Sequence, residues 1–296
     1  MITSYSNKSV REVIQLTQKA KARNKQGVFV VEGIKMFSEA PMERIERVYI
    51  AQRAEKELWE TYRDKLNRLS CETVADDVFD KMSDTKTPQG VLTLVRQYHY
   101  RLEELLTRKE SRQCIDRTTG KSVSIIGGVH QKNSLYLLLE DIQDPGNLGT
   151  IFRTAEAVGA DGILMSNHTV DVYNPKTIRS TMGSIYRVPF IYREDICETI
   201  RILQKHDICV YAADLGGRKA YDTYDYRGGT AFLIGNEGNG LREETAACAE
   251  ERIWIPMEGK VESLNAAVAS TVLFYEAYRQ RRKGIRNKPD GKDLKR

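Results

Sequence analysis

The chain has 296 residues, of which 41% are hydrophobic and 29% charged, and its formal net charge is +5. This length predicts about two domains with ordinary buried cores. No apolar run approaches the ~20 residues that cross a membrane, and no secretory signal opens the chain, so we expect a cytoplasmic protein. The five cysteines and four histidines lack metal-ligand spacing, which predicts no metal site and no disulfide framework.

Residues 1–97 alternate between helical and strand patterns, which predicts a small α/β/α layer domain. The expected elements are helix 8–23, strand 28–31, a short helix from Ile34, strand 47–51, helix 55–69, strand 71–74, a short helix after Asp76 and strand 90–95. Basic residues crowd its beginning, namely Lys8, Arg11, Lys19, Lys21, Arg23 and Lys25. Such clusters bind nucleic-acid phosphates by releasing counterions, although a solvated helix face has the same composition.

Two stretches differ from their surroundings in composition. Residues 98–133 begin with a charged stretch that suits a helix over 101–110 and continue as a polar, glycine-containing run, so we interpret them as an interdomain linker. Residues 284–296 are basic with almost no apolar side chains, which predicts a disordered tail.

Residues 134–283 alternate strands and helices over a longer stretch. The expected strands are 134–140, 161–165, 188–192, 208–213, 230–234 and 252–256, and the expected helices are 147–158, 174–184, 195–205, 241–250 and 263–282. Such alternation builds a mostly parallel α/β sheet with helices on both faces.

The first strand of this second domain runs into a polar turn and a helix with a single apolar stripe. The stripe consists of Leu148, Ile151, Phe152, Ala155 and Val158. We expect Asn147 to cap the start of this helix and Gly159 to end it. Arg153 lies opposite the stripe, where its guanidinium either meets a ligand or another chain or is a solvated surface charge.

Two later strands also end in glycine-containing loops, at residues 235–240 and 255–265. Ligands of open α/β sheets bind at such strand ends, where glycine lets the backbone approach closely and helix N-termini present free N–H groups. These loops predict a ligand site. Ser263 and Asn265, which precede a long apolar helix, are either helix caps or substrate ligands.

Taken together, residues 144–154, 234–241 and 255–265 resemble the three signature motifs of the SpoU/TrmH family, the RNA ribose 2′-O-methyltransferases of the SPOUT superfamily. Residues 174–184 resemble the segment between the first two motifs. The resemblance covers residues 134–283 and implies a SPOUT domain with a deep trefoil knot, a rare exception among folds. The N-terminal domain resembles the substrate-binding domain, similar to the ribosomal protein L30e, of many SpoU proteins.

The same resemblance implies the methyl donor S-adenosylmethionine and the residues that hold it. The expected donor contacts are Gly235, Ile255 and Leu264, with Gly240 and Met257 lining the pocket. For the two apolar side chains, core packing is an alternative that does not exclude cofactor contact.

The resemblance also places Arg153 at the reacting ribose, with Asn147, Glu237, Ser263 and Asn265 around it. Arginine has a pKa above about 12 and is a poor base. We therefore interpret Arg153 as a phosphate clamp that also stabilises alkoxide charge. Glu237 is the better base, or else a scaffold that accepts loop N–H groups.

Several statements about partners follow from the resemblance. We expect 23S ribosomal RNA as substrate, with a tRNA 2′-O-methyltransferase as the alternative, because small tRNA-modifying relatives usually lack the extra domain. Lys8, Arg11, Lys176 and Arg179 are candidate RNA contacts or else surface charges. We also expect a homodimer through the last helix, whose apolar surface comprises Val268, Ala269, Val272, Leu273 and Ala277; the alternative is that this surface only covers the chain's own sheet.

Two other functions fit less well. A nucleotide-cofactor oxidoreductase is disfavoured because residues 235–240 have the spacing G-x-x-G-x-G, the reverse of the dinucleotide fingerprint. A non-catalytic RNA-binding ribosome assembly factor is disfavoured because the polar motif residues of the enzyme are present, including Arg153 and Glu237.

Overall fold

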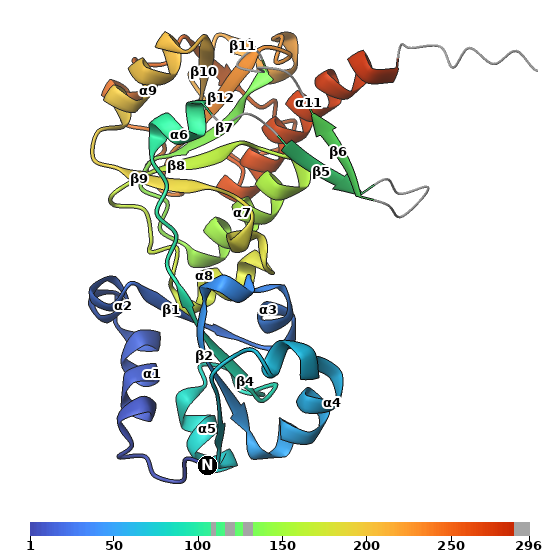
Figure 1. Ribbon diagram of the computed structural model, residues 1–296. Helices are drawn as coiled ribbons and strands as arrows, with labels where there is room; N and C mark the ends of the chain where they lie inside the picture. Colours follow the sequence, from blue (N-terminus) through green and yellow to red (C-terminus); the bar gives the residue numbers. More distant parts are fainter. Residues whose placement is uncertain (108–110, 116–121, 127–132, 287–296) are drawn as a thin grey trace, which may run out of the picture. The chain divides into compact units, whose positions relative to one another are not determined.

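The computed structural model describes residues 1–107, 111–115, 122–126 and 133–286 (Figure 1). Contacts divide the chain into two compact units. The first comprises Met1–His99, Asp144–Arg153 and Val170–Arg187, and the second comprises Tyr100–Gln143, Thr154–Thr169 and the chain from Val188 onward. Within the described ranges, no helix combines the length and hydropathy that crossing a membrane requires.

The first unit contains a four-stranded mixed sheet in the order β1 (Val28–Glu32), β4 (Val91–Arg96), β2 (Ile45–Ala51) and β3 (Cys71–Val74). Strand β4 runs antiparallel to both of its neighbours, while β2 and β3 are parallel. On one face, α1 (Lys8–Gln18) and α5 (Asp76–Met82) contribute to the core, and on the other α3 (Ile34–Glu39) and α4 (Glu55–Leu66) do so. This is the layered α/β arrangement that the sequence predicts.

The predicted helix 8–23 is two helices, α1 and α2 (Ala20–Gln26), because Lys19 between them has an extended backbone with φ −123° and ψ 113°. The break lets Arg23 turn back into the protein. Its side chain is 4% exposed, donates to the Leu16 carbonyl at 2.7 Å and pairs with Asp171 at 2.5 Å. A buried guanidinium needs such partners. Arg23 is therefore a structural residue, unlike the exposed Lys8 and Arg11.

Residues 170–187 belong to the core of the first unit, although their place in the sequence assigns them to the second domain. They contain α8 (Pro175–Thr181) and a short 3-10 helix, Ser184–Tyr186. The ring of Tyr173 lies 4.6 Å from that of Phe29, and the Tyr186 hydroxyl donates to the Met36 carbonyl at 3.0 Å. Sequence order does not reveal which of two cores such a segment joins.

The second unit contains a seven-stranded sheet in which every neighbouring pair is parallel. Its order is β11 (Lys219–Ala220), β13 (Glu251–Trp254), β10 (Ile208–Ala213), β12 (Gly229–Ile234), β7 (Leu135–Leu139), β8 (Gly162–Ser166) and β9 (Phe190–Arg193). The sequence predicts all of these strands except the two-residue edge strand β11. The mostly parallel α/β class is confirmed, and the trefoil knot stays a prediction.

Helices cover both faces of this sheet. On one face, α6 (Leu102–Thr107) and α9 (Ile196–Lys205) pack over a core that includes Leu138, Leu164 and Leu233. On the other face, the ring centre of Phe274 in α11 (Ala266–Arg286) lies 6.3 Å from that of Phe232. The predicted helix 241–250 is shorter, because α10 spans only Glu243–Ala246.

Helix α7 (Pro145–Val158) is shared by the two units, which divide after Arg153. All five residues of its predicted apolar stripe are buried. Gly159, at φ +70°, follows its last residue, as the sequence predicts.

In the stretch 98–133, helix α6 lies within the predicted helix 101–110. The pairing of β5 (Ser111–Ile115) with β6 (Ser122–Ile126) as an antiparallel two-stranded sheet was not predicted. Two short strands flanked by polar, glycine-containing residues give too weak a pattern to be recognised. Of the predicted disordered tail, residues 284–286 continue α11, and residues 287–296 lie outside the described part of the chain.

Candidate active site

In the second unit, the carboxyl ends of β10, β12 and β13 surround a cavity of about 340 Å³. All five residues that the sequence assigns to the cofactor line it, namely Gly235, Gly240, Ile255, Met257 and Leu264. Two predicted catalytic residues, Glu237 and Ser263, line it as well. The volume is within the range of small-molecule sites, and the position obeys the strand-end rule for parallel sheets.

The loop 235–240 is a tight turn built from backbone contacts. Asn236 and Gly240 exchange two backbone hydrogen bonds of 3.0 and 2.9 Å. The Asn236 Oδ1 atom accepts from the N–H groups of Gly238 at 2.9 Å and Asn239 at 3.0 Å. A Cβ atom on Gly235 would overlap the backbone of Gly240 and Leu241. The glycine at 235 is therefore required by a close backbone approach.

A buried carboxylate fixes the far end of this loop. Glu140, which is 1% exposed, directly follows β7. Its two oxygens accept from the Arg242 side chain at 2.9 and 2.7 Å, from the Arg242 backbone N–H at 2.9 Å and from the Thr245 hydroxyl at 2.6 Å. The hydrogen bond to Glu140 also raises the pKa of Arg242. The loop is thus fastened to the centre of the sheet.

Further bonds join this loop to the one after β7. Asp141 has φ +57°, a conformation that costs on the order of 1 kcal/mol for a residue with a side chain. Its carbonyl accepts from the Asn236 amide at 2.7 Å, and its backbone N–H donates to Ser166 Oγ at 2.8 Å. Glu237 Oε2 accepts the Gln143 backbone N–H at 3.0 Å. By accepting this loop N–H group, Glu237 acts as a scaffold, which is one of the two roles that the sequence leaves open for it.

The start of α7, in the first unit, differs from the prediction. The helix begins at Pro145, and Asp144 caps it by accepting the Asn147 backbone N–H at 2.8 Å. This hydrogen bond, helped by Lys176, lowers the pKa of Asp144. The predicted cap at Asn147 was wrong because proline suits the first helical position and shifts the cap to the residue before it.

Arg153 is exposed on α7, and no other residue in the described part of the chain pairs with its side chain. It is the last residue of the first unit, whereas the cavity lies in the second.

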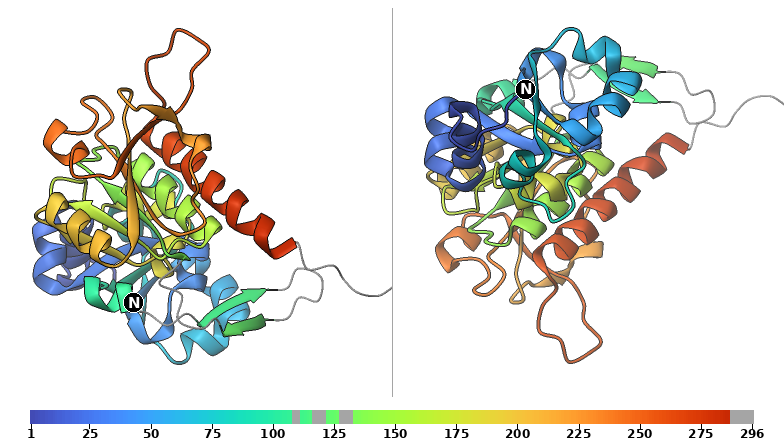
Figure 2. Two further views of the ribbon diagram at one scale, coloured as in Figure 1. Left: turned by 90° about the horizontal axis from the view of Figure 1, so that it is seen from above. Right: turned by 90° about the horizontal axis from the view of Figure 1, so that it is seen from below.

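At the other end of the site, Asn265 is the cap of α11. Its Oδ1 atom accepts from the N–H groups of Ala267 at 2.9 Å and Val268 at 3.3 Å. Ser263 is exposed and faces the cavity. Ser263 and Asn265 both belong to the loop 255–265, which projects from the sheet (Figure 2).

The cavity wall also contains residues outside the predicted loops, among them Asp214 and Leu215. Both directly follow β10, so the strand-end rule that selected the other loops also applied to them. Leu215 is 63% exposed, which is unusual for a large apolar side chain.

The four candidate RNA contacts all belong to the first unit. Lys8 and Arg11 are exposed on α1. Lys176 Nζ lies 3.3 Å from Asp144 Oδ2, and Arg179 Nη1 lies 2.6 Å from Asp84 Oδ2. The two residues on α8 therefore have acidic partners within the protein.

Comparison with known proteins identifies both parts of the chain. A sequence model of the SpoU rRNA methylase family matches residues 134–275, and one of the MRM3-like substrate binding domain matches residues 7–93. The uncharacterized tRNA/rRNA methyltransferase slr1673 of Synechocystis is 30% identical over 94% of this chain and 93% of its own. The chain belongs to the SpoU methylase family.

Other SpoU proteins match along nearly the whole chain. The 23S rRNA (guanosine(2553)-2'-O)-methyltransferase RlmP of Bacillus subtilis is 28% identical over 93% of this chain and 97% of its own. The AdoMet-bound rRNA methyltransferase from Sinorhizobium meliloti has a TM-score of 0.76 and 29% identity, and the match covers 94% of this chain and 97% of that one. The family expected from the three motifs is confirmed.

The geometry of the loop 235–240 predicts how an added methyl group at Gly235 changes cofactor binding. We expect Gly235→Ala to lower S-adenosylmethionine affinity about ten- to a hundredfold, since overpacking against backbone costs about 1–3 kcal/mol. Isothermal titration calorimetry measures this. Gly238→Ala is the matched control, because its added Cβ meets only Asn236 Oδ1 at 3.5 Å. Wild-type affinity in the Gly235 variant would place the cofactor elsewhere.

Proposed function

We propose that this SpoU protein is an S-adenosylmethionine-dependent RNA ribose 2′-O-methyltransferase that acts on 23S ribosomal RNA. The main support is the cavity at three parallel strand ends, lined by residues of the second and third motifs. The relatives named for 23S rRNA methylation support the choice of RNA. With this substrate we also propose a cytoplasmic location.

The cavity suits the proposed cofactor chemically. Its walls combine apolar side chains such as Ile255 and Leu264 with the close backbone of Gly235 and Gly240. The carboxylates of Asp214, Glu237 and Glu262 also line it, and they favour a cationic ligand. When bound, S-adenosylmethionine supplies a methyl group on a positively charged sulfonium. We assign Gly235, Gly240, Ile255, Met257 and Leu264 to holding it.

The remaining motif residues act on the RNA. Arg153 has an exposed guanidinium that can grip a phosphate in two places, and its fixed positive charge stabilises the negative charge that develops on the ribose 2′-oxygen. Glu237 holds the loop after β7 through Gln143, and it is the group best suited to accept the 2′-hydroxyl proton. We assign Asn147, Ser263 and Asn265 to orienting the ribose.

RNA also contacts the first unit in this proposal. Lys8 and Arg11 are exposed on the N-terminal domain, whose family counterpart is described as substrate binding. Together with Lys176, these cations neutralise backbone phosphates. Arg179, which Asp84 holds, has a different role that is argued below.

The product of the reaction tests this function. We expect the purified protein to transfer a methyl group from S-adenosylmethionine to a 23S rRNA transcript, and EDTA to leave the activity intact. Digestion of the RNA to nucleosides, followed by mass spectrometry, should give a 2′-O-methylnucleoside. A base-methylated nucleoside would contradict the proposal, and methylation of tRNA alone would change the substrate. Cofactor binding without any methylation would favour an assembly factor.

Arg153→Ala separates catalysis from cofactor binding. We expect turnover to fall at least about a hundredfold, since loss of one stabilising donor has that effect, while S-adenosylmethionine affinity stays within a few fold. Arg53→Ala is a control, because Arg53 is a similarly exposed arginine of the first unit, where it pairs with Asp80. A variant that no longer binds the cofactor would show that Arg153 belongs to the donor site.

We further propose that the protein is a homodimer through α11. Of the residues that the sequence suggests for this surface, Leu273 and Ala277 are fully buried within their own unit, whereas Val268 is 48% exposed. Tyr275, which the sequence does not single out, is 47% exposed. Val268 and Tyr275 are two helical turns apart and lie on one face. This exposed stripe, rather than Leu273, is the surface that a partner would cover.

Light scattering at micromolar concentration tests the dimer. We expect twice the chain mass of 33.8 kDa for the wild type and a shift toward monomer for Tyr275→Glu, because a charge would be buried without a partner. Met182→Glu is the control, since Met182 is also an exposed apolar residue but belongs to the first unit. A wild-type monomer would rule out the dimer.

A further inference from the structure

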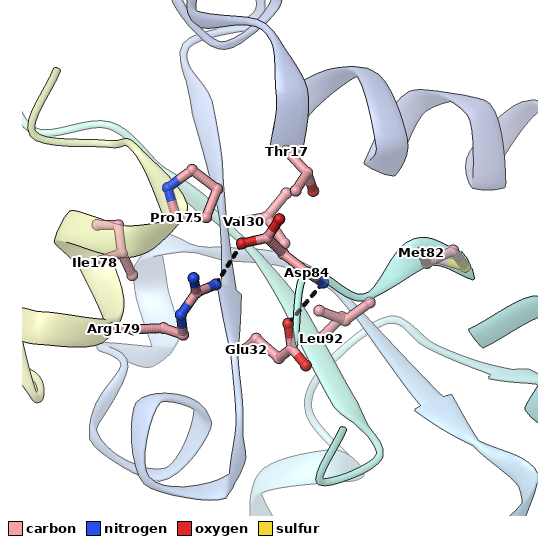
Figure 3. Close-up of a pocket in the computed structure, with 9 residues that line it drawn as sticks. All are labelled: Thr17, Val30, Glu32, Met82, Asp84, Leu92, Pro175, Ile178 and Arg179. Atoms are coloured by element: carbon pink, nitrogen blue, oxygen red, sulfur yellow. Dashed lines mark hydrogen bonds and ion pairs between the residues drawn. The ribbon is translucent and has the colours of Figure 1, made fainter. Parts of the chain in front are cut away.

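An ion pair in the first unit connects α8 to the N-terminal sheet (Figure 3). Arg179 of α8 extends its guanidinium to Asp84, with 2.6 Å between Nη1 and Oδ2. Asp84 is itself held, because its backbone N–H donates to Glu32 Oε2 at 3.2 Å. The Glu32 Oε1 atom accepts from the hydroxyls of Ser83 and Thr85, each at 2.5 Å. Arg179 therefore pairs with the carboxylate of Asp84, whose loop is hydrogen-bonded to Glu32 at the end of β1.

Helix α8 also packs closely against the first half of α7. A Cβ atom on Gly149 would overlap the Ser180 side chain and lie 2.8 Å from the Thr177 carbonyl oxygen. Lys176 adds its ion pair with Asp144, the cap of α7. The two helices thus meet backbone to backbone, so a displacement of α8 has to displace α7.

The rest of the segment around α8 is anchored on the same domain. Asp171 pairs with the buried Arg23, and Arg187 pairs with Glu39 at 2.8 Å. Ile178 is buried, and α8 contacts β1. A continuous path of contacts therefore leads from the N-terminal sheet through α8 to the part of α7 that carries Asn147 and Arg153.

We propose that Arg179 is a positioning residue whose ion pair with Asp84 sets the place of Arg153 relative to the RNA-binding domain. The inference rests on the proposed function, in which Arg153 meets the target ribose. RNA held by the N-terminal domain is then presented to an arginine carried by the same compact unit. An alternative is that Arg179 binds an RNA phosphate directly and that Asp84 competes for it.

The two roles predict opposite kinetic behaviour. For a positioning pair, Arg179→Ala and Asp84→Ala should each lower kcat about ten- to a hundredfold, because a displacement of about 1 Å has that effect. KM for RNA should change less than threefold, as should S-adenosylmethionine affinity. Arg179→Lys should retain more activity than Arg179→Ala. The exchanged pair, Asp84→Arg with Arg179→Asp, should recover most of the loss.

Two controls keep the test specific. Arg53→Ala removes an ion pair of the same kind, with Asp80, that does not involve α8, and it should leave kcat unchanged. The Asp84–Arg179 pair is partly exposed, with 44% and 33% side-chain exposure, so it adds little stability and the variants should fold. Hydrogen exchange of residues 145–153 should quicken in both single variants and return to normal in the exchanged pair.

Each result decides between the roles. A raised KM for RNA in Arg179→Ala, a smaller salt dependence, and tighter RNA binding in Asp84→Ala would make Arg179 an RNA ligand and overturn the proposal. Unchanged kcat and unchanged exchange in both single variants would overturn it too. If the wild type methylates no RNA, the proposed function fails, and the exchange measurement still supports or refutes the positioning of α7.

Discussion

The active-site architecture depends on the need to satisfy one buried carboxylate. Glu140 lies at the carboxyl end of β7, an interior strand of the sheet, and is almost fully buried, so its charge requires close partners. Arg242 and Thr245 supply them, and both follow the loop 235–240 in the sequence. Breaking a fully buried pair costs about 3–5 kcal/mol, and less here because the Arg242 side chain is half exposed. The loop that walls the cavity is therefore tied to the core of the sheet.

The two units differ in the charges that the proposed function uses. The cavity of the second unit is lined by Asp214, Glu237 and Glu262, whereas the exposed cations proposed to meet RNA, including Arg153, belong to the first. This division suits a reaction between a cationic methyl donor and a polyanionic RNA. Helix α7 contains residues of both units, which divide after Arg153.

The sequence by itself determined the features that depend on local pattern. Strands buried on both faces have to be continuously apolar, and this is why β7, β10 and β12 were recognisable. Gly235 permits a close backbone approach, and Gly240 has a φ of +69°, a conformation that favours glycine. The motif residues assigned to the cofactor follow β12 and β13, the two strands that flank β10 in the sheet, so a strand-end rule was enough to group them in one cavity.

The tertiary structure decided what depends on partners distant in the sequence. Arg23 has the composition of a surface cation, but Asp171 and the carbonyl of Leu16 make it a buried one. Residues 170–187 join the core of the N-terminal domain, and Leu273 faces inward although the helical pattern alone equally suits a dimer surface. Periodicity predicts that an apolar residue is buried, and only the folded chain shows which group it packs against.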